Sequence, residues 1–134
     1  MVRPKIKSKK YLTPLEWEIM NAVWKLGGKP SVREVIELAY PKQEKAYTTV
    51  QTVMNNLTKK SFLKKKKVGL VNFYEPLIQR SDMLAGAVNS FVKSVFSGSF
   101  FAMAMFIINS DKLTQMELKN IKHSLQPKEK GGKG

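Results

Sequence analysis

The chain has 134 residues, of which 43% are hydrophobic and 25% are charged, which suits one globular domain or two very small ones. It contains no cysteine, so disulfide bonds, thiol catalysis and cysteine metal sites are excluded. The charge is strongly basic, because 24 Lys and Arg residues stand against 10 Asp and Glu residues, a formal net charge of +14.

The positive charge is concentrated in the first part of the chain. Residues 1–80 carry 17 basic and 6 acidic side chains, a net charge of +11, whereas residues 81–134 carry 7 and 4, a net charge of +3. A basic half joined to a more apolar half predicts a module that binds a polyanion, with a second function attached. The alternative is that the lysines only keep the protein soluble, but their clustering favours the first interpretation.

The N-terminal sequence MVRPKIKSKK has no apolar segment, so residues 1–11 are predicted to be a flexible basic arm and not a secretory signal. The longest apolar run, FFAMAMFII at 100–108, has nine residues, whereas a helix that crosses a bilayer needs about 20. We therefore expect a soluble cytoplasmic protein with no membrane partner.

Two helices with clear start signals come next. In LTPLEWEIMNAVWKLGG, Thr13 and Glu16 have the spacing of a capping box at the start of an apolar stripe. In SVREVIELAYP, Ser31 and Glu34 form a second capping box, and this shorter helix ends before Pro41.

The third segment, AYTTVQTVMNNLTKK at 46–60, has a composition that disfavours a helix, because six of its fifteen residues are β-branched. Its apolar residues nevertheless fall at helical spacing, at Val50, Val53, Met54 and Leu57. The pattern predicts a helix with one buried stripe and an opposite face of Thr, Gln and Asn side chains.

The periodicity then changes from helical to alternating. FLKKKKVGLVNFYEP predicts two strands, at about 62–67 and 70–75, joined through Val68-Gly69. The side chains expected to face the core are Leu63, Val71 and Phe73, with lysines facing water. Three helices and a hairpin predict a mainly α fold with a small β-hairpin, in which residues 12–78 form a winged-helix DNA-binding domain.

The second half of the chain predicts three more helices, at 81–96, 100–110 and 113–125. Ser81 is expected to cap the first of them, and Thr114 with Glu117 forms a capping box for the last. The middle helix is apolar almost all round, so it requires burial.

About 50 residues cannot wrap such a helix on all sides, and a unit this small usually needs a partner surface. We predict that residues 79–126 form a helical homodimerisation domain with interlocked helices, and that residues 127–134 are a disordered tail. The alternative is an ordinary core helix packed on the first domain. The predicted dimer contacts are Leu84, Val88, Phe91, Val95, Phe100, Phe101, Met105, Phe106, Leu118 and Ile121.

No motif predicts catalysis, a metal or a cofactor. His123 is the only histidine and lies on a lysine-rich helix, where a surface position is more common than a catalytic one. Phosphate loops, G-x-S-x-G and metal-spaced clusters of His, Asp and Glu do not occur in the sequence. We therefore expect a protein that is not an enzyme.

Binding to double-stranded DNA is better supported by the sequence. In a helix-turn-helix the recognition helix offers its polar face to the major groove, where Gln and Asn can pair with adenine and a Thr methyl can touch thymine. The candidate base-reading residues are Thr48, Thr49, Gln51, Thr52 and Asn55. The candidate phosphate-contacting residues are Lys42, Lys45, Lys59, Lys65, Lys66 and Lys67. A merely solvated polar face remains the alternative for this helix.

Four stretches of the chain match a known family: LTPLEWEIMNAVW at 12–24, SVREVIELAY at 31–40, AYTTVQTVMNNLTKKSFL at 46–63 and VNFYEP at 71–76. They resemble the penicillinase-repressor family of bacterial winged-helix regulators, of the BlaI/MecI type. The stretch AYTTVQT is the most specific part. The resemblance implies a homodimeric repressor whose third helix reads a palindromic operator, with contacts from residues such as Thr48 and Thr52, and whose wing lysines contact the backbone.

Two departures from the family limit what the resemblance implies. Copper sensing in one branch uses a cysteine motif, which this chain lacks. The resistance repressors are cut at an Asn-Phe bond within the dimerisation domain, and residues 99–109 contain no Asn-Phe. The resemblance therefore does not identify an inactivating protease or ligand.

The sequence as a whole predicts a homodimeric repressor of transcription on a double-stranded DNA operator. Its alternative is a basic protein that binds nucleic acid without sequence preference, as chromatin-like or RNA-associated proteins do. A third possibility is an adaptor that binds acidic proteins through its lysines.

Overall fold

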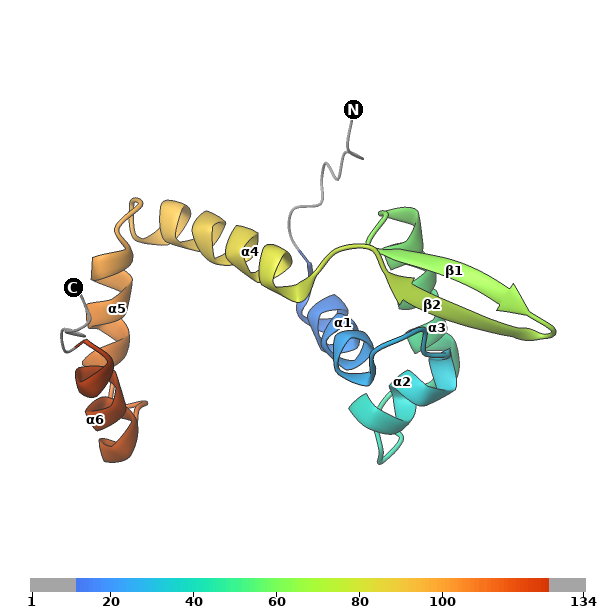
Figure 1. Cartoon of the computed structure of the whole chain (residues 1–134), viewed down its shortest axis with the longest axis horizontal. Helices are drawn as coiled ribbons and strands as arrows, with labels where there is room; N and C mark the ends of the chain where they lie inside the picture. The colour runs from blue at the N-terminus through green and yellow to red at the C-terminus, as the bar shows by residue number, and fades with distance from the viewer. Residues whose placement is uncertain (1–11, 126–134) are drawn as a thin grey trace, which may run out of the picture. The chain divides into compact units, whose positions relative to one another are not determined.

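The computed structural model describes residues 12–125, so the predicted basic arm and the predicted disordered tail lie outside the described residues. Six helices and one hairpin follow each other along this part of the chain (Figure 1). Their bounds are α1 Pro14–Leu26, α2 Val32–Ala39, α3 Tyr47–Lys59, β1 Leu63–Val68, β2 Val71–Pro76, α4 Arg80–Val95, α5 Phe100–Ile108 and α6 Gln115–Ser124.

The chain divides into two compact units, and the division falls after Val88, inside α4. The first turn of α4 belongs to the first unit, because Met83 is buried in the same core as α1, α2 and α3. Two long-range hydrogen bonds hold this turn and the residues before it: Trp24 Nε1 donates to the carbonyl of Ile78 at 3.0 Å, and Arg80 Nε donates to Asn21 Oδ1 at 2.9 Å. The boundary between residues 78 and 79, predicted to separate the two functional domains, remains a prediction.

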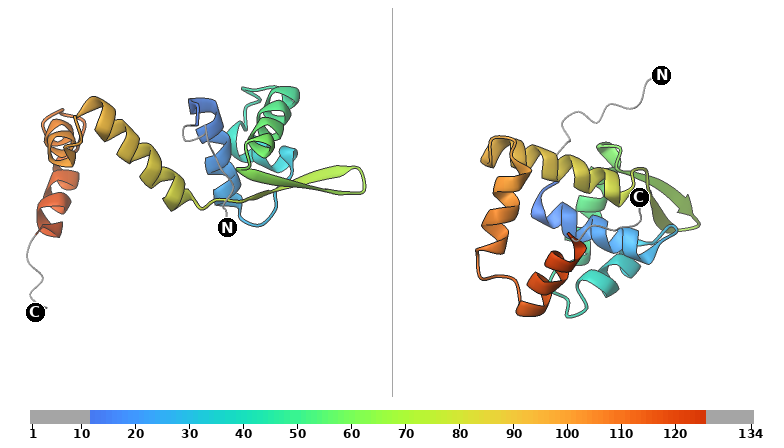
Figure 2. Two further views of the ribbon diagram at one scale, coloured as in Figure 1. Left: turned by 90° about the horizontal axis from the view of Figure 1, so that it is seen from above. Right: turned by 60° about the vertical axis from the view of Figure 1, so that its left-hand side comes forward.

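The first unit has the predicted winged-helix architecture, which confirms the mainly α fold class with a small β-hairpin. β1 and β2 pair antiparallel from Leu63 opposite Pro76 to Val68 opposite Val71. An isolated bridge between Ser31 and Phe73 places the start of α2 beside β2. The hairpin extends beyond the three helices of this unit, as Figure 1 and the left view of Figure 2 show.

The capping boxes that start α1 and α2 are confirmed. Thr13 Oγ1 accepts from the Glu16 amide at 3.1 Å, and Glu16 Oε1 accepts from the Thr13 amide at 2.9 Å. Ser31 and Glu34 repeat this arrangement at 3.2 and 2.8 Å. Each box satisfies two amides that the helix itself leaves without a partner, so both helices begin where the sequence predicted.

α3 begins without such a cap, because its N-cap residue Ala46 makes no side-chain hydrogen bond. Packing holds it instead: Val50, Met54 and Leu57 are completely buried, and Val53 is partly buried against the same core. The predicted stripe is therefore confirmed, and tertiary burial compensates for the low helix propensity of the β-branched residues.

The hairpin differs from the sequence prediction in position and in which residues face the core. Both strands begin one residue later than predicted, and Val71 is exposed at the tip, where it pairs with Val68. Leu63 is buried as predicted and Phe73 is only half-buried, but the main core residue of β2 is Tyr74, which is completely buried. Opposed residues of an antiparallel pair share a face, so Tyr74 lies on the face of Lys65 and Leu63, which is the side turned to the helices.

In the second half of the chain, the helix starts agree only partly with the prediction. α4 begins at Arg80, so Ser81 lies inside its first turn and the prediction of a Ser81 cap is wrong. The capping box of Thr114 and Glu117 at the start of α6 is confirmed, with hydrogen bonds of 3.0 and 2.9 Å.

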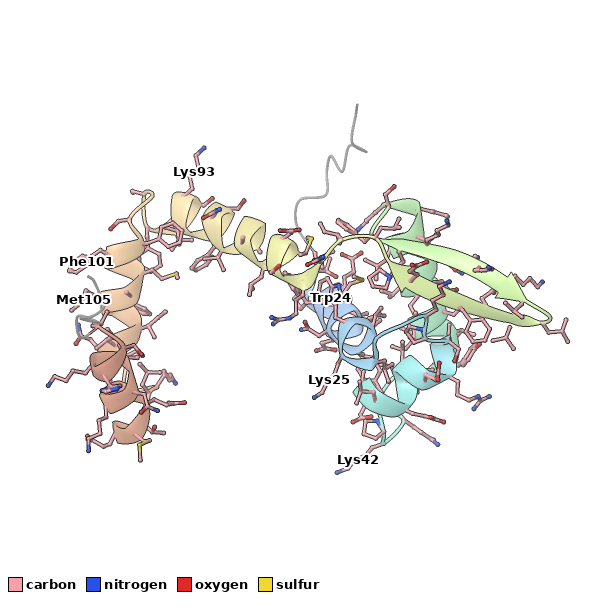
Figure 3. The ribbon with its side chains drawn as sticks, in the orientation of Figure 1. Trp24, Lys25, Lys42, Lys93, Phe101 and Met105 are labelled. Atoms are coloured by element: carbon pink, nitrogen blue, oxygen red, sulfur yellow. The ribbon has the colours of Figure 1, made fainter. Side chains whose placement is uncertain are left out.

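The expected burial of α5 does not occur within the chain, since none of its nine residues is buried. Phe101 is 75% exposed and Phe106 is 65% exposed. Phe101 and Met105, one turn apart, lie on the same side of the helix (Figure 3). Aromatic contacts join Phe96 to Phe91 and to Phe106, with ring centroids 6.0 and 6.1 Å apart, but they cover only part of this surface. The apolar residues of α5 therefore form a large exposed surface.

One ion pair joins the beginning of α1 to the end of α3. Lys60 Nζ donates to Glu16 Oε2 at 2.7 Å, while the other Glu16 oxygen caps α1. Burial by itself would raise the pKa of Glu16, but the hydrogen bonds from Lys60 and Thr13 outweigh it and leave the pKa below its ordinary value of 4.5. The folded state therefore favours the charged carboxylate.

This pair predicts a pH-dependent contribution to stability. Because folding lowers the pKa of Glu16, the contribution is complete above the ordinary pKa of 4.5 and is lost as the pH falls through the lowered value. We expect Glu16→Gln to cost about 1 kcal/mol at neutral pH, since Lys60 is 41% exposed and water screens the pair. The difference from wild type should shrink towards pH 3. Urea unfolding at one protein concentration, from pH 7 to pH 3, measures it.

Glu34→Gln is the matched control, because Glu34 caps α2 in the same way without an ion pair in the described part of the chain. An equal pH dependence for both variants would show that the capping box, and not the pair with Lys60, is responsible.

Candidate nucleic-acid interface

The face of α3 opposite its buried stripe is exposed and polar. At 100° per residue, Thr48 and Thr52 lie almost opposite the buried side chains of Val50 and Leu57. Both threonines are exposed. Thr49 and Asn56 are exposed beside them, and Lys59 ends the same face. This face is a shallow strip of short side chains, which allows close approach of the helix backbone to another surface.

Gln51 lies closer to the wing than the two threonines do, and it is half-buried. It lines a hollow of about 460 Å³ together with Tyr47 from the start of α3, Arg33 from α2 and Asn72 from the wing. The other lining residues are Ser31, Val32, Glu34, Leu70, Val71 and Phe73. The hollow therefore separates the beginning of α3 from the tip of the hairpin.

Asn55 is tied to the wing. Its Oδ1 accepts hydrogen bonds from the Tyr74 hydroxyl at 2.8 Å and from Lys65 Nζ at 3.2 Å. Burial, and secondarily Tyr47, raise the pKa of Tyr74, so the hydroxyl stays protonated and keeps donating. The oxygen of Asn55 thus links α3 to β1 and β2, and its amide nitrogen takes no part in these two bonds.

The strand register divides the wing lysines between two faces. Lys65 and Lys67 lie opposite Tyr74 and Asn72, on the side turned to α3, whereas Lys66 lies opposite Phe73 on the other side. All of the lysines from 64 to 67 are exposed. Alternation along a strand predicts that Lys65, Lys66 and Lys67 do not all share one face, and the register separates Lys66 from Lys65 and Lys67.

The remaining lysines lie at the two ends of α3. Lys42 and Lys45 are exposed in the turn between α2 and α3, and Lys42 points away from the helices (Figure 3). Lys59 is exposed at the end of α3, but the adjacent Lys60 is held by Glu16. Of the predicted lysines, Lys45 and Lys59 lie near the two ends of α3, and Lys65 and Lys67 lie on the side of the wing turned to α3.

Three further residues that are not among the predicted site residues line the hollow beside α3, namely Arg33, Tyr47 and Asn72. The signal for Tyr47 was its spacing, because Tyr47, Gln51 and Asn55 recur every four residues along one side of α3. Arg33 and Asn72 carried no such signal, since the start of α2 meets β2 only in the tertiary structure.

The predicted dimer residues are exposed or half-buried in the single chain. Val88, Leu118 and Ile121 are half-buried. A hollow of about 640 Å³ lies along α6 and the end of α5, lined by apolar residues such as Met116 and Leu125 and by Lys119 and Lys122. The exposed residues of the set are Leu84, Phe91, Val95, Phe100, Phe101, Met105 and Phe106.

Across residues 12–125, no single helix is both long and apolar enough to span a bilayer, and only α4 and α5 counted together, as a sharply bent pair, reach that length and apolarity. The same residues contain no group of three or more His, Asp and Glu side chains arranged to hold a metal ion.

The chain is similar in sequence to regulatory proteins from several bacteria. The Methicillin resistance regulatory protein MecI of Staphylococcus aureus strain N315 is 26% identical over 117 residues, which cover 87% of this chain and 94% of that protein. The Penicillinase repressor of Bacillus licheniformis is 27% identical over 115 residues, or 86% of this chain and 89% of that protein. The Transcriptional regulator BlaI of Mycobacterium tuberculosis is 32% identical over 89 residues, or 66% of this chain and 64% of that protein.

The sequence profile of the family described as penicillinase repressor matches residues 12–127. This match takes in nearly all of the chain, with both the winged helix and the α5–α6 region. The chain therefore belongs to the penicillinase repressor family.

Proposed function

We propose that the protein is a sequence-specific repressor of transcription that binds double-stranded DNA as a homodimer. α3 enters the major groove of each half of a palindromic operator, and the wing contacts the phosphate backbone beside it. The observation that carries the proposal is the exposed polar strip of α3, which lies opposite the buried residues Val50, Met54 and Leu57 and between two groups of lysines.

The strip has the chemistry of base-edge contacts. The Thr48 and Thr52 hydroxyls can donate or accept, and their methyl groups can meet a thymine methyl. α3 contains no arginine, so the common bidentate contact to guanine is not offered by this helix. We therefore expect the α3 contribution to favour A/T base pairs.

The wing supplies the part of the affinity that does not depend on sequence. Lysines that neutralise phosphates release counterions, so binding should weaken steeply as salt rises. Lys65 and Lys67 lie on the α3 side of the hairpin, where the backbone of a duplex held by α3 passes. Lys65 is also positioned by its bond to Asn55.

Homodimerisation would cover the exposed apolar surface of α5. A monomer would leave Phe100, Phe101 and Phe106 in water at 51–75% exposure, and exposed apolar patches are typical of protein–protein interaction sites. A second copy is the simplest partner, and two-fold symmetry of the protein implies an inverted repeat in the DNA. Occupation of such a site would block transcription by excluding the polymerase, which places the protein in the bacterial cytoplasm.

Selection from a random-sequence duplex library with the pure protein tests this function directly. The enriched duplexes should contain an inverted repeat, and their affinity should exceed that for random duplexes by about 10³-fold or more at fixed salt. Equal affinity for all duplexes would instead identify a basic protein that binds nucleic acid without sequence preference. Binding to acidic proteins in place of DNA would favour the adaptor.

Base reading and phosphate contact should separate by mutation. We expect Thr52→Ala to change the sequence preference at one position of each half-site, at constant salt dependence, because it removes a base-edge contact. Lys65→Ala/Lys67→Ala should weaken binding to all duplexes alike and lower the slope of log K against log salt by about 2. Fluorescence anisotropy with selected and random duplexes from 50 to 200 mM salt measures both.

The matched control is Lys64→Ala/Lys66→Ala, which removes the same charge from the opposite face of the wing. An equal loss for both lysine pairs would mean that net charge, and not the α3-facing side, determines the backbone contact.

Asn55 should act through position more than through base contact. Asn55→Ala removes the acceptor of both Tyr74 and Lys65, and it leaves the buried Tyr74 hydroxyl without its partner. We expect a loss of about 1–3 kcal/mol in unfolding free energy, together with weaker DNA binding. Asn56→Ala is the control, since Asn56 is exposed on the same helix. Unchanged stability of Asn55→Ala would contradict a positioning role.

The oligomeric state should depend on α5. Analytical ultracentrifugation of the wild type at micromolar concentration should give a dimer, and Phe101→Ser/Phe106→Ser should give a monomer that binds the inverted repeat much more weakly. Leu77→Ser is the control, because Leu77 is also a half-exposed apolar residue, at 54% exposure, but lies in the first unit. A monomeric wild type would refute the dimer.

A further inference from the structure

The connection between β2 and α4 is held against the winged helix at several successive residues. The Leu77 amide donates to the Phe62 carbonyl at 2.9 Å, and Ile78 packs against the core. Met83, in the first turn of α4, is only 5% exposed. Linkers between independent units are usually exposed and make few such contacts. This connection therefore belongs to the first unit and gives α4 a fixed start.

Trp24 of α1 holds this connection by a hydrogen bond between residues that are 54 positions apart in the chain. Its indole Nε1 donates to the Ile78 carbonyl at 3.0 Å, and the side chain lies beside the start of α4 (Figure 3). At this start the Asp82 amide donates to the Gln79 carbonyl at 3.1 Å, so the first helical bond begins one residue after Ile78. The Ile78 carbonyl is thus available to the indole, whose single N–H needs a partner when it is buried.

Arg80 lies where the electrostatics of a helix disfavour a cation. It is the first residue of α4, next to the positive end of the helix dipole. Its Nε donates to Asn21 Oδ1 on α1 at 2.9 Å, a contact that gives this arginine a tertiary role. Asn21 and Trp24 are three residues apart on α1, so they share one side of that helix. Asn21, Trp24, Ile78 and Arg80 therefore form one α1–α4 junction.

α4 carries the direction that the α1–α4 junction gives it into the second unit. It is a continuous helix of 16 residues, Arg80–Val95, and the division into two units falls inside it, after Val88. At 1.5 Å per residue the helix is about 24 Å long, so a tilt of about 10° at its first turn displaces its far end by about 4 Å. That displacement is larger than the step of about 3.4 Å between successive base pairs. In a symmetric dimer, the α1–α4 junction therefore controls the distance between the two α3 helices.

We propose that Asn21, Trp24 and Arg80 are positioning residues that set the distance between the two half-sites of the operator. They act through α4, because they hold its first turn and contact no base in this role. The proposal rests on the homodimeric DNA-binding function proposed above, and it adds the residues that determine the spacing of the half-sites. A junction that served only the stability of the winged helix would leave that spacing unchanged.

Duplexes that carry the selected half-site twice, in inverted orientation and at different separations, test the proposal. The wild type should bind its best separation about 100-fold more tightly than one about 5 base pairs longer, because half a helical turn places the half-sites on opposite faces of the duplex. Asn21→Ala/Trp24→Phe removes the acceptor and the donor on α1 without changing the net charge. We expect this variant to lower the ratio to less than about tenfold and to bind a single half-site as tightly as the wild type. Fluorescence anisotropy at fixed salt measures both quantities.

Trp17→Phe/Asn120→Ala is the matched control, because it makes the same two substitutions at side chains that have no hydrogen bond within residues 12–125. Trp17 is also close to the junction, since its ring centroid lies 6.1 Å from that of Trp24. The inference is overturned if Asn21→Ala/Trp24→Phe keeps the wild-type ratio, or if the control lowers the ratio as much.

An equal loss of affinity for single and paired half-sites would also overturn the inference, because it would indicate a destabilised winged helix. A wild type that binds every separation alike contradicts the inference alone. A wild type that is monomeric, or that prefers no duplex, refutes the proposed function itself, so the two failures are distinguishable.

Discussion

The structure of the first unit depends on the burial of one stripe of α3. Val50, Met54 and Leu57 are completely buried among α1, α2 and the hairpin. Burial of a large aliphatic side chain contributes about 1.5–3 kcal/mol. That is enough to hold a helix whose β-branched composition and uncapped start would leave it marginal in isolation. The same burial fixes the opposite face outward, so the stability of α3 and the orientation of Thr48 and Thr52 have a single cause.

Polar contacts then fix α3 at its middle and at its C-terminal end. Lys60 joins its last turn to the capping box of α1 through Glu16, and Asn55 joins its middle to Tyr74 and Lys65 of the wing. Each contact uses a residue type that also suits DNA. Lys60 and the oxygen of Asn55 are therefore committed to the fold, while Lys59 and Lys67 remain exposed. Residues that are adjacent in the sequence can therefore differ in role: Lys60 is bonded to Glu16 within the fold, whereas Lys59 is exposed and makes no such bond in the described part of the chain.

In the second unit, by contrast, most large apolar side chains are exposed instead of buried. α5 and α6 start with side-chain caps, but α5 buries none of its nine residues and its aromatic side chains remain largely in water. Such a segment is stable only against further apolar surface. A second chain would supply that surface, and it would also give the two recognition helices the symmetry that an inverted repeat demands. The exposed apolar surface of the second unit and the proposed DNA binding by the first unit are therefore connected, because one dimer would account for both.

The sequence by itself determined the helices, the hairpin and the buried stripe of α3, because capping boxes, helical spacing and alternation are local signals. It also identified the family through AYTTVQT. It misplaced the core contact of the wing, choosing Val71 where Tyr74 is buried. Strand register decides this point, because a shift of one residue exchanges the two faces of a strand. Only the tertiary structure brings Arg33, Gln51 and Leu70 around one hollow and directs Asn55 to the wing, because these contacts join segments that are far apart in the chain.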